Sequence, residues 1–374
     1  MKLLVLATKY PNQNGQSMMY VHVRNKYYVN NGIDVDVISF ETKTSYLYEG
    51  INVMSLDDYK KSNKQYDVLV CHAANVKEHY LFIKKYNSRF RKIVMFYHGH
   101  EILKLSDVYP RPYSWKKNKN IFLQDLYDDF KFALWKRILT KNLKKMHLVF
   151  VSNWLYERFL YYIHINPYKL ENKHSIINNS VGEIFETKQY DMKSKKKYDF
   201  ITIRGSSLDG SKYGVDIVYN LALKYPNYKF LIVGKGDFFE HNKLLDNIEY
   251  IPKSLTHDEM INYINMSKFA LLPTREDTQG VLTCEMFSFG IPTITSNIEV
   301  CREIFSGIEN VRLIDNDVEN VDIDLVINEL DNSKKSYNKK YFKENTIQME
   351  IELYEKIMKE DDWDNEKNWN NNVS

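Results

Sequence analysis

The chain has 374 residues, which is enough for two domains of ordinary size. Hydrophobic residues make up 44% and charged residues 27%, as in globular proteins, and a net charge of +3 argues against a dedicated nucleic-acid-binding protein. The three cysteines lack the spacing of metal ligands, so we expect reduced thiols in a cytoplasmic protein. No apolar stretch approaches the roughly 18 residues of a membrane span.

Strands and helices are predicted to alternate through the first half of the chain. The apolar run at 2–7 leads into a loop with Gly15, and a helical pattern then continues to about Gly32. Strands that alternate with helices predict parallel βαβ units. The further apolar runs of strand length are 33–40, 66–73, 92–101, 147–153 and 173–180.

The same alternation restarts after a charged stretch at 191–199, which we interpret as a linker. The fold predicted is therefore α/β, with two Rossmann-like doubly wound domains that face a cleft, where such sheets bind ligands. We expect a helix at 341–360 to return to the first domain and a disordered polar tail at 361–374. The two domains are predicted to span 1–190 and 199–340.

Two acids in the second domain have a notable spacing. In "PTREDTQGVLTCEMFSFGIP", Asp277 and Glu285 lie eight positions apart, behind a predicted strand. A short helix is predicted over 280–289, with Asp277 or Thr278 as its N-cap. In one interpretation Asp277 is only a cap and Glu285 only a solvated helix residue. The pairing of the two acids behind a strand favours a binding function instead.

The start of this helix suits an anion. The amides of Gly280, Val281 and Leu282 would have no partner within the helix, and Gly280 lets a phosphate approach closely. Glu285 would lie about 7–8 Å further along the helix and could accept hydrogen bonds from a ribose diol. Asp277 could accept from hydroxyls of a group on the far phosphate. The spacing matches a sugar, a diphosphate and a ribose laid end to end.

Together these residues resemble the motif of the retaining glycosyltransferases of family 4, which have the GT-B fold. Pro273-Thr274, Asp277, Gly280, Glu285 and Gly290-Ile291-Pro292 occupy its acid-x7-acid pattern, although the first acid of the family is usually Glu. The resemblance implies sugar transfer from a nucleotide diphosphate sugar to a hydroxyl of a glycan or lipid-linked acceptor. It also implies bacterial surface-polysaccharide synthesis.

The resemblance extends to other positions of the chain. Arg204 and Lys212 are similar to the basic pair that holds the donor diphosphate, so no metal or other cofactor is expected. His98 occupies the position that reaches the transferred sugar, and a neutral imidazole could donate to a sugar hydroxyl there. Alternatively, His98 is satisfied by backbone groups, or joins His72 and His100 in a metal site. The remaining predicted residues are Gly234 and Pro252 on the donor side, and Gly15, Gln16 and His100 on the acceptor side.

Cations and aromatic residues alternate from 111 to 145. One interpretation is a helix packed on the first domain with a solvated basic side. The other is a surface that touches the inner face of the plasma membrane, where aromatic rings enter the headgroups and lysines meet anionic lipid.

The sequence is also compatible with two other functions. One is a nucleotide-sugar epimerase of the GT-B type, which needs no glycan or lipid acceptor. The other is a non-catalytic sugar-binding subunit of a polysaccharide-assembly machine. A Rossmann dehydrogenase is disfavoured, because no Gly-x-Gly-x-x-Gly follows the first strand.

Overall fold

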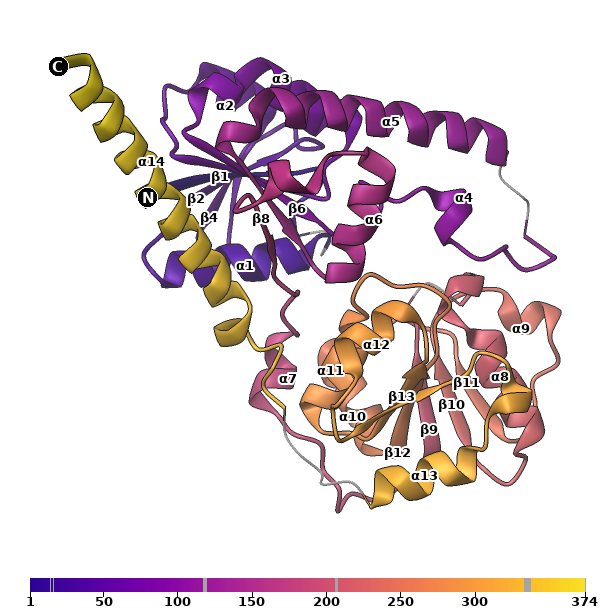
Figure 1. Cartoon of the computed structure of the whole chain (residues 1–374). Coiled ribbons are helices and arrows are strands. Elements are labelled where there is room, and N and C mark those ends of the chain that lie inside the picture. The colour runs from indigo at the N-terminus through magenta and orange to yellow at the C-terminus, as the bar shows by residue number, and fades with distance from the viewer. Residues whose placement is uncertain (14, 16, 117–119, 206–207, 333–337, 374) are drawn as a thin grey trace. The chain divides into compact units, whose positions relative to one another are not determined.

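The structure is a computed structural model that describes residues 1–13, 15, 17–116, 120–205, 208–332 and 338–373, the last thirteen by their backbone (Figure 1). The chain forms two compact units. Unit 1 contains Met1–Lys104, Asp125–Ser180 and Lys343–Ser374, and unit 2 contains Leu105–Gln124 and Val181–Phe342. Residues 105–124, which the sequence places within the first domain, thus belong to unit 2.

Unit 1 is built on an eight-stranded sheet in the order β3-β4-β2-β1-β5-β6-β7-β8. Its strands pair in parallel except for β3, which is antiparallel to β4 at the edge of the sheet. The β3–β4 hairpin was not predicted. The strands are β1 (Lys2–Ala7), β2 (Asp34–Ser39), β3 (Tyr46–Tyr48), β4 (Ile51–Met54), β5 (Val68–His72), β6 (Lys92–Tyr97), β7 (Met146–Phe150) and β8 (His174–Ile176).

Helices cover both faces of this sheet (Figure 1). Alternate residues of β1, Leu3 and Val5, share a core with helices α1 (Met19–Asn30) and α14 (Ile347–Val373). Helices α2 (Leu56–Lys61), α3 (Leu81–Tyr86) and α5 (Ile121–Asn142) lie on the other face. Helix α6 (Asn153–Ile163) follows β7.

Helix α14 joins the C-terminal end of the chain to unit 1. Its buried Glu350 accepts a hydrogen bond from Arg24 Nε of α1 over 3.0 Å. Tyr28 of α1 also bonds Glu350. The helix continues to Val373, beyond the end at 360 predicted from the sequence and through the segment expected to be a disordered tail.

Unit 2 contains a six-stranded parallel sheet in the order β11-β10-β9-β12-β13-β14. This is the doubly wound order of a dinucleotide-binding fold, in which the connections reverse direction between β9 and β12. The linker predicted at 191–199 ends before residue 198, because Tyr198 and Asp199 already belong to β9. The strands are β9 (Tyr198–Ile203), β10 (Phe230–Val233), β11 (Ile248–Ile251), β12 (Ser267–Leu272), β13 (Thr293–Ser296) and β14 (Val311–Ile314).

The helices of unit 2 also lie on both faces of its sheet (Figure 1). Buried side chains of α8 (Val215–Lys224) and α13 (Ile323–Asp331) share one core with β9, β10 and β12. In the described part of the chain, no helix combines the length and the apolar content needed to cross a membrane. The other helices of the unit are α4 (Leu105–Val108), α7 (Glu183–Thr187), α9 (Phe238–His241), α10 (His257–Asn265), α11 (Val281–Phe289) and α12 (Glu299–Phe305).

Candidate functional site

The predicted donor residues gather at one edge of the sheet of unit 2. Arg204 directly follows β9, and the loop with Asp277 follows β12, its neighbour at the reversal point. Carboxyl ends of parallel strands at such a point commonly bind ligands. A pocket of about 220 Å³ lies there. Its lining comprises Ile203, Arg204, Tyr213, Asp277, Gly280, Leu282 and Thr283.

Helix α11 begins at this pocket, but not with the predicted cap. Gly280 is the N-cap residue, with φ of 76°, and no side chain caps the helix. Asp277 instead accepts hydrogen bonds from the amides of Thr278 (2.8 Å) and Gln279 (3.4 Å), in the turn before the helix. The predicted cap at Asp277 or Thr278 is therefore wrong. The left-handed backbone at Gly280 separates that turn from the helix.

Arg204 is fixed by the backbone of two neighbouring loops. Its guanidinium donates to the carbonyl oxygens of Tyr213 (3.2 Å) and Pro273 (2.7 Å). Burial lowers the pKa of Arg204 to about 10, against the opposing effect of Asp277, so the group stays charged at neutral pH. Arg204 thus presents a fixed positive charge beside the carboxylate of Asp277.

Lys212 lies beside the same carboxylate. Burial opposes its charge, but the negative charge of Asp277 and the contact with Tyr109 raise the pKa of Lys212 above its ordinary value. Its ammonium lies 4.8 Å from the ring centre of Tyr109. The structure therefore brings Arg204, Lys212 and Asp277 into one electrostatic group, although Lys212 does not line the 220 Å³ pocket.

Glu285 is partly buried on α11, one turn beyond the pocket. Its Oε1 accepts a hydrogen bond from the amide of Gly182 over 3.1 Å. A Cβ atom at Gly182 would lie 3.2 Å from that oxygen, so the glycine permits the contact. Burial raises the pKa of Glu285 to about 7, and the Gly182 amide opposes this shift. Glu285 can thus change its charge near neutral pH.

The other predicted donor residues lie at the same edge of the sheet, outside the lining of that pocket. Gly234 follows β10 and donates its amide hydrogen to Ile251 over 3.0 Å. Its φ is 156°, and a Cβ atom there would lie 3.0 Å from the carbonyl oxygen of Gly205. Pro252 follows β11 and is exposed, and Val281 is the first residue of α11.

A segment of unit 2 that the sequence did not assign to the donor residues lies against them. Besides the Tyr109 contact with Lys212, Tyr113 donates its hydroxyl hydrogen to Asp216 over 2.7 Å. The Ser211 hydroxyl donates to the carbonyl oxygen of Arg111 over 2.7 Å. Residues 109–113 therefore support the loop that carries Lys212. These partners are about one hundred residues apart in sequence, so no local pattern could reveal them.

The next residues continue this packing. Trp115 stacks on Tyr113, with ring centroids 4.7 Å apart, and on His241 at 4.9 Å. Lys116 pairs with Asp209 (3.1 Å) and Asp237 (2.8 Å). Tyr113 and Trp115, which were candidates for a membrane-facing surface, thus pack on unit 2 itself. Lys117 and Lys119, from the same stretch, lie outside the described residues.

His98, in unit 1, directly follows β6. Its Nε2 lies 3.2 Å from Nδ1 of His72, and its ring meets that of Tyr20 at 4.9 Å. Burial, with the nearby charge of Arg24, lowers the pKa of His98 to about 3, so its imidazole is neutral at physiological pH. The neighbouring rings of His72 and Tyr20 therefore hold the His98 side chain in place. Its neutral imidazole is also suited to donate a hydrogen bond.

The remaining acceptor-side residues are less enclosed. The strand predicted over 92–101 ends at Tyr97, so His98 and His100 follow it, and His98 is half-buried while His100 is exposed. Gly15 pairs with Asn12 through two backbone hydrogen bonds. Gln16 lies outside the described residues. No group of three or more His, Cys, Asp or Glu side chains in the described part could hold a metal ion.

Comparisons with known proteins bear on this arrangement. Residues 203–324 match the family model for glycosyl transferases group 1, and a search of curated proteins found no match. Three solved structures match nearly the whole chain. A sucrose-phosphate synthase from Thermosynechococcus elongatus matches with a TM-score of 0.70 and 10% sequence identity, over 96% of this chain and 99% of that one. A glycosyltransferase from Rickettsia africae matches with a TM-score of 0.67 and 15% identity, over 96% and 98% of the two chains. The catalytic domain of starch synthase IV from Arabidopsis thaliana, bound to ADP and acarbose, matches with a TM-score of 0.61 and 10% identity, over 95% and 99% of the two chains.

The fold is GT-B. The family match, which contains Arg204, Lys212, Asp277 and Glu285, supports a glycosyltransferase built on this fold. The comparisons do not favour the epimerase or the non-catalytic subunit.

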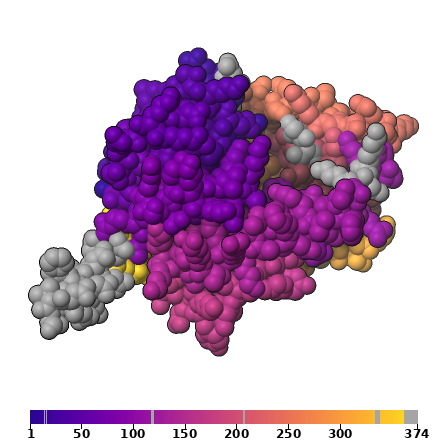
Figure 2. Space-filling view, turned by 90° about the horizontal axis from the view of Figure 1, so that it is seen from above, coloured from indigo at the N-terminus to yellow at the C-terminus, as the bar shows by residue number. Residues whose placement is uncertain are grey.

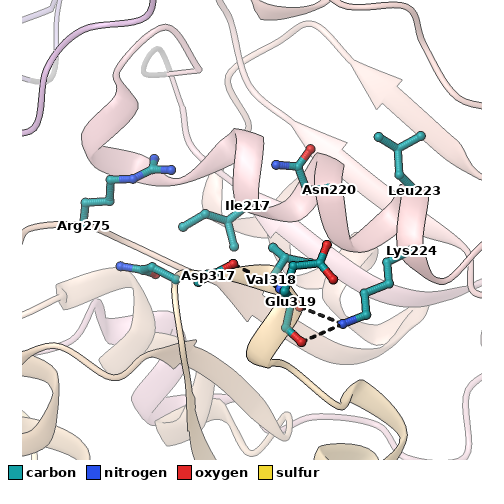
Figure 3. A pocket seen from close by; sticks show the side chains of 9 residues that line it. Ile217, Asn220, Leu223, Lys224, Arg275, Asp317, Val318 and Glu319 are labelled. Atoms are coloured by element: carbon teal, nitrogen blue, oxygen red, sulfur yellow. Dashed lines mark hydrogen bonds between the residues drawn. The ribbon is translucent and has the colours of Figure 1, made fainter.

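A second pocket of the GT-B C-terminal unit has a volume of about 560 Å³. It lies between α8 and the loop at 316–319, and Lys224 reaches across to the carbonyl oxygens of Val318 (2.9 Å) and Glu319 (3.1 Å) (Figure 3). None of the predicted donor residues lines it. Its two cations, Lys224 and Arg275, already bond to the carbonyl oxygen of Val321 and to Asp216, so the pocket is poorly suited to an anionic ligand.

Proposed function

We propose that this protein is a retaining glycosyltransferase of family 4. It would move a sugar from a nucleotide diphosphate sugar to a hydroxyl of a glycan or lipid-linked acceptor in bacterial surface-polysaccharide synthesis. The observation that carries the proposal is the pocket beyond β9 and β12, where Arg204, Asp277 and the start of α11 meet. A cation, a carboxylate and unpaired helix amides suit a diphosphate joined to a hydroxyl-bearing sugar.

Each donor group has a proposed partner. Arg204 and Lys212 bind the diphosphate with the amides of residues 280–282, which stabilise the negative charge that builds on the leaving phosphate. Asp277 accepts hydrogen bonds from the transferred sugar, and Glu285 from the ribose. Gly234 and Pro252 lie towards the base. Arg204 and Lys212 supply the positive charge, so the proposal requires no metal.

Transfer with retention would proceed on one face of the sugar. The acceptor oxygen attacks the anomeric carbon on the side from which the diphosphate departs, and its proton passes to the leaving phosphate oxygen. His98, as a neutral imidazole, donates a hydrogen bond to the transferred sugar. Gly15, Gln16 and His100 are assigned to the acceptor side. A cytoplasmic enzyme peripheral to the inner face of the plasma membrane would meet a lipid-linked acceptor.

Product analysis tests the proposal. The protein is incubated with UDP-, GDP- and ADP-sugars, with and without glycan and lipid extracts, and the products are analysed by NMR. We expect acceptor-dependent release of one nucleoside diphosphate and a product with the anomeric configuration of the donor. Asp277→Asn should abolish the transfer. Conversion of donor alone to an epimer would replace the proposal with an epimerase, and an inverted product would exclude retention.

A further inference from the structure

Helix α5 is apolar on two opposite faces. Phe132, Trp135 and Leu139 are buried against unit 1, together with the ion pair between Lys131 and Asp128. A helix that packs on a sheet normally needs only one apolar face, and the other is polar. The first half of α5 departs from this rule.

The face opposite to the buried one carries large exposed side chains. Phe122 is 75% exposed, Leu126 60% and Phe130 57%, and these residues follow one another at four-residue intervals. Leu123 (59%) and Tyr127 (50%) form a second row beside them. We call these five residues the α5 apolar strip. Helix α5 belongs to the surface turned to the viewer in Figure 2.

The same face becomes cationic further along the helix. Arg137 and Lys141 lie seven and eleven residues after Phe130, so they continue its row, and both are exposed. Among the described residues, neither side chain has an ion-pair partner. Asp129, an exposed acid directly before Phe130, is paired with Lys104 over 3.2 Å. The outward face of α5 therefore consists of an apolar half and a free cationic half.

We propose that this face docks the protein on an anionic lipid bilayer. The strip lies along one face of a single helix and runs directly into exposed cations. Aromatic and aliphatic side chains can enter the headgroup region from such a face, and the adjacent cations meet anionic headgroups. The exposed side chains by themselves are the basis for docking on lipid. The idea that docking brings the enzyme to a lipid-linked acceptor rests on the proposed function.

The aromatic residues that precede α5 do not contribute to the proposed docking surface. The aromatic residues of 111–116 pack on unit 2, so in the described part of 111–145 the large exposed apolar side chains all lie in α5. Docking would therefore depend on α5 and not on Tyr113 or Trp115.

Vesicle co-sedimentation of the full chain tests the proposal. The vesicles are phosphatidylcholine alone or phosphatidylcholine mixed with phosphatidylglycerol. Wild-type protein should bind the anionic vesicles and not the neutral ones. The triple variant Phe122→Ser, Leu126→Ser and Phe130→Ser should lose at least tenfold in affinity. The double variant Arg137→Gln and Lys141→Gln should lose the preference for anionic vesicles.

Matched controls come from other exposed apolar residues. Leu47 and Tyr168 are 71% and 85% exposed in unit 1, away from α5, and Leu47→Ser with Tyr168→Ser should bind vesicles like the wild type. Equal binding by the strip variant and this control would overturn the proposal, as would wild-type protein that ignores anionic vesicles. A dimer that the strip variant abolishes would assign the surface to a second copy. Vesicle binding needs no sugar transfer, so its failure would leave the proposed function standing.

Discussion

Burial raises the pKa of the Glu285 carboxyl into the neutral range, and the one amide hydrogen bond that it accepts, from Gly182, offsets only part of this shift. Its folded pKa of about 7 lies above its ordinary value of 4.5. The neutral form is therefore favoured in the folded protein. This contribution to stability is fully present below about pH 4.5 and is lost as the pH rises through 7.

We predict that Glu285→Gln weakens nucleoside diphosphate binding by about tenfold or more at pH 8, because a hydrogen bond to a charged acceptor contributes about 1.5–3 kcal/mol. At pH 6 the wild-type carboxyl is largely protonated, so the ratio of the two dissociation constants should fall towards one. Isothermal calorimetry with UDP, GDP and ADP measures this ratio. Protonation of the nucleotide affects both proteins equally, so it cancels in the ratio. A ratio that does not depend on pH would contradict the role of Glu285.

Gly280 offers a second prediction, because its φ of 76° is unfavourable for any residue with a Cβ atom. Gly280→Ala should cost about 1 kcal/mol of stability and weaken nucleotide binding, since the new Cβ lies at the start of α11, 3.3 Å from the ring of Phe305. Gly307→Ala is the matched control, with φ of 79° and nothing within 4 Å. Chemical denaturation should show a loss in both variants, but only Gly280→Ala should bind the nucleotide less tightly.

At this scale the sequence could predict the acids and the glycine, because a strand end, a helix start and a helix stop are local patterns. The geometry at Asp277 could not be predicted. Its role in the turn depends on the left-handed backbone of Gly280, which "TQG" does not specify. Gly182 was also missed, because it lies 103 residues before its partner Glu285.

Among the elements, the segment at 109–116 connects the first half of the chain to the donor residues. The ring centre of Tyr109 lies 4.8 Å from the ammonium of Lys212, a residue proposed to bind the diphosphate. We predict that Tyr109→Ala weakens nucleoside diphosphate binding by about 2- to 30-fold, the range of a cation–π contact worth about 0.5–2 kcal/mol. Tyr109→Phe keeps the ring and should bind almost normally. If both variants bind alike, the ring does not position Lys212.

The elements also show where sequence patterns stop being informative. Alternating strands and helices were predicted in both halves, because apolar periodicity reports local burial. The three-residue strand β3 carries no such signal, since only one of its sides pairs and its Leu47 is exposed. The interpretation of α5 was ambiguous for the opposite reason. Both of its faces are apolar, so periodicity could not tell the packed face from the exposed one.

At the scale of the whole chain, helix α14 places the C-terminal segment, Lys343–Ser374, in unit 1. Its Glu350 is buried with Arg24, which is 326 residues earlier. Burial raises the pKa of Glu350, and Arg24 opposes that shift, so the arginine keeps the carboxyl closer to its charged form. No local pattern indicates this pair, although a helix at 341–360 was predicted.

We predict that Arg24→Met costs about 3–5 kcal/mol of stability near pH 8, since it leaves a buried charge without its partner. The loss should shrink as the pH falls and Glu350 becomes protonated. The double variant Arg24→Met and Glu350→Met should recover most of the stability, because both charges are then gone. Denaturant melts at several pH values measure this. A loss that is equal at pH 5 and pH 8 would contradict the assignment.

The proposed function requires unit 2 to bind a nucleoside diphosphate beyond β9 and β12. Isothermal titration of UDP, GDP and ADP into wild-type protein and Arg204→Met tests it most directly. The prediction is that at least one of the three binds the wild type and that the variant, with an unchanged circular dichroism spectrum, binds it at least tenfold more weakly. Equal binding by both proteins would exclude Arg204 from a diphosphate site, and no binding of any of the three nucleotides would exclude the donor site altogether.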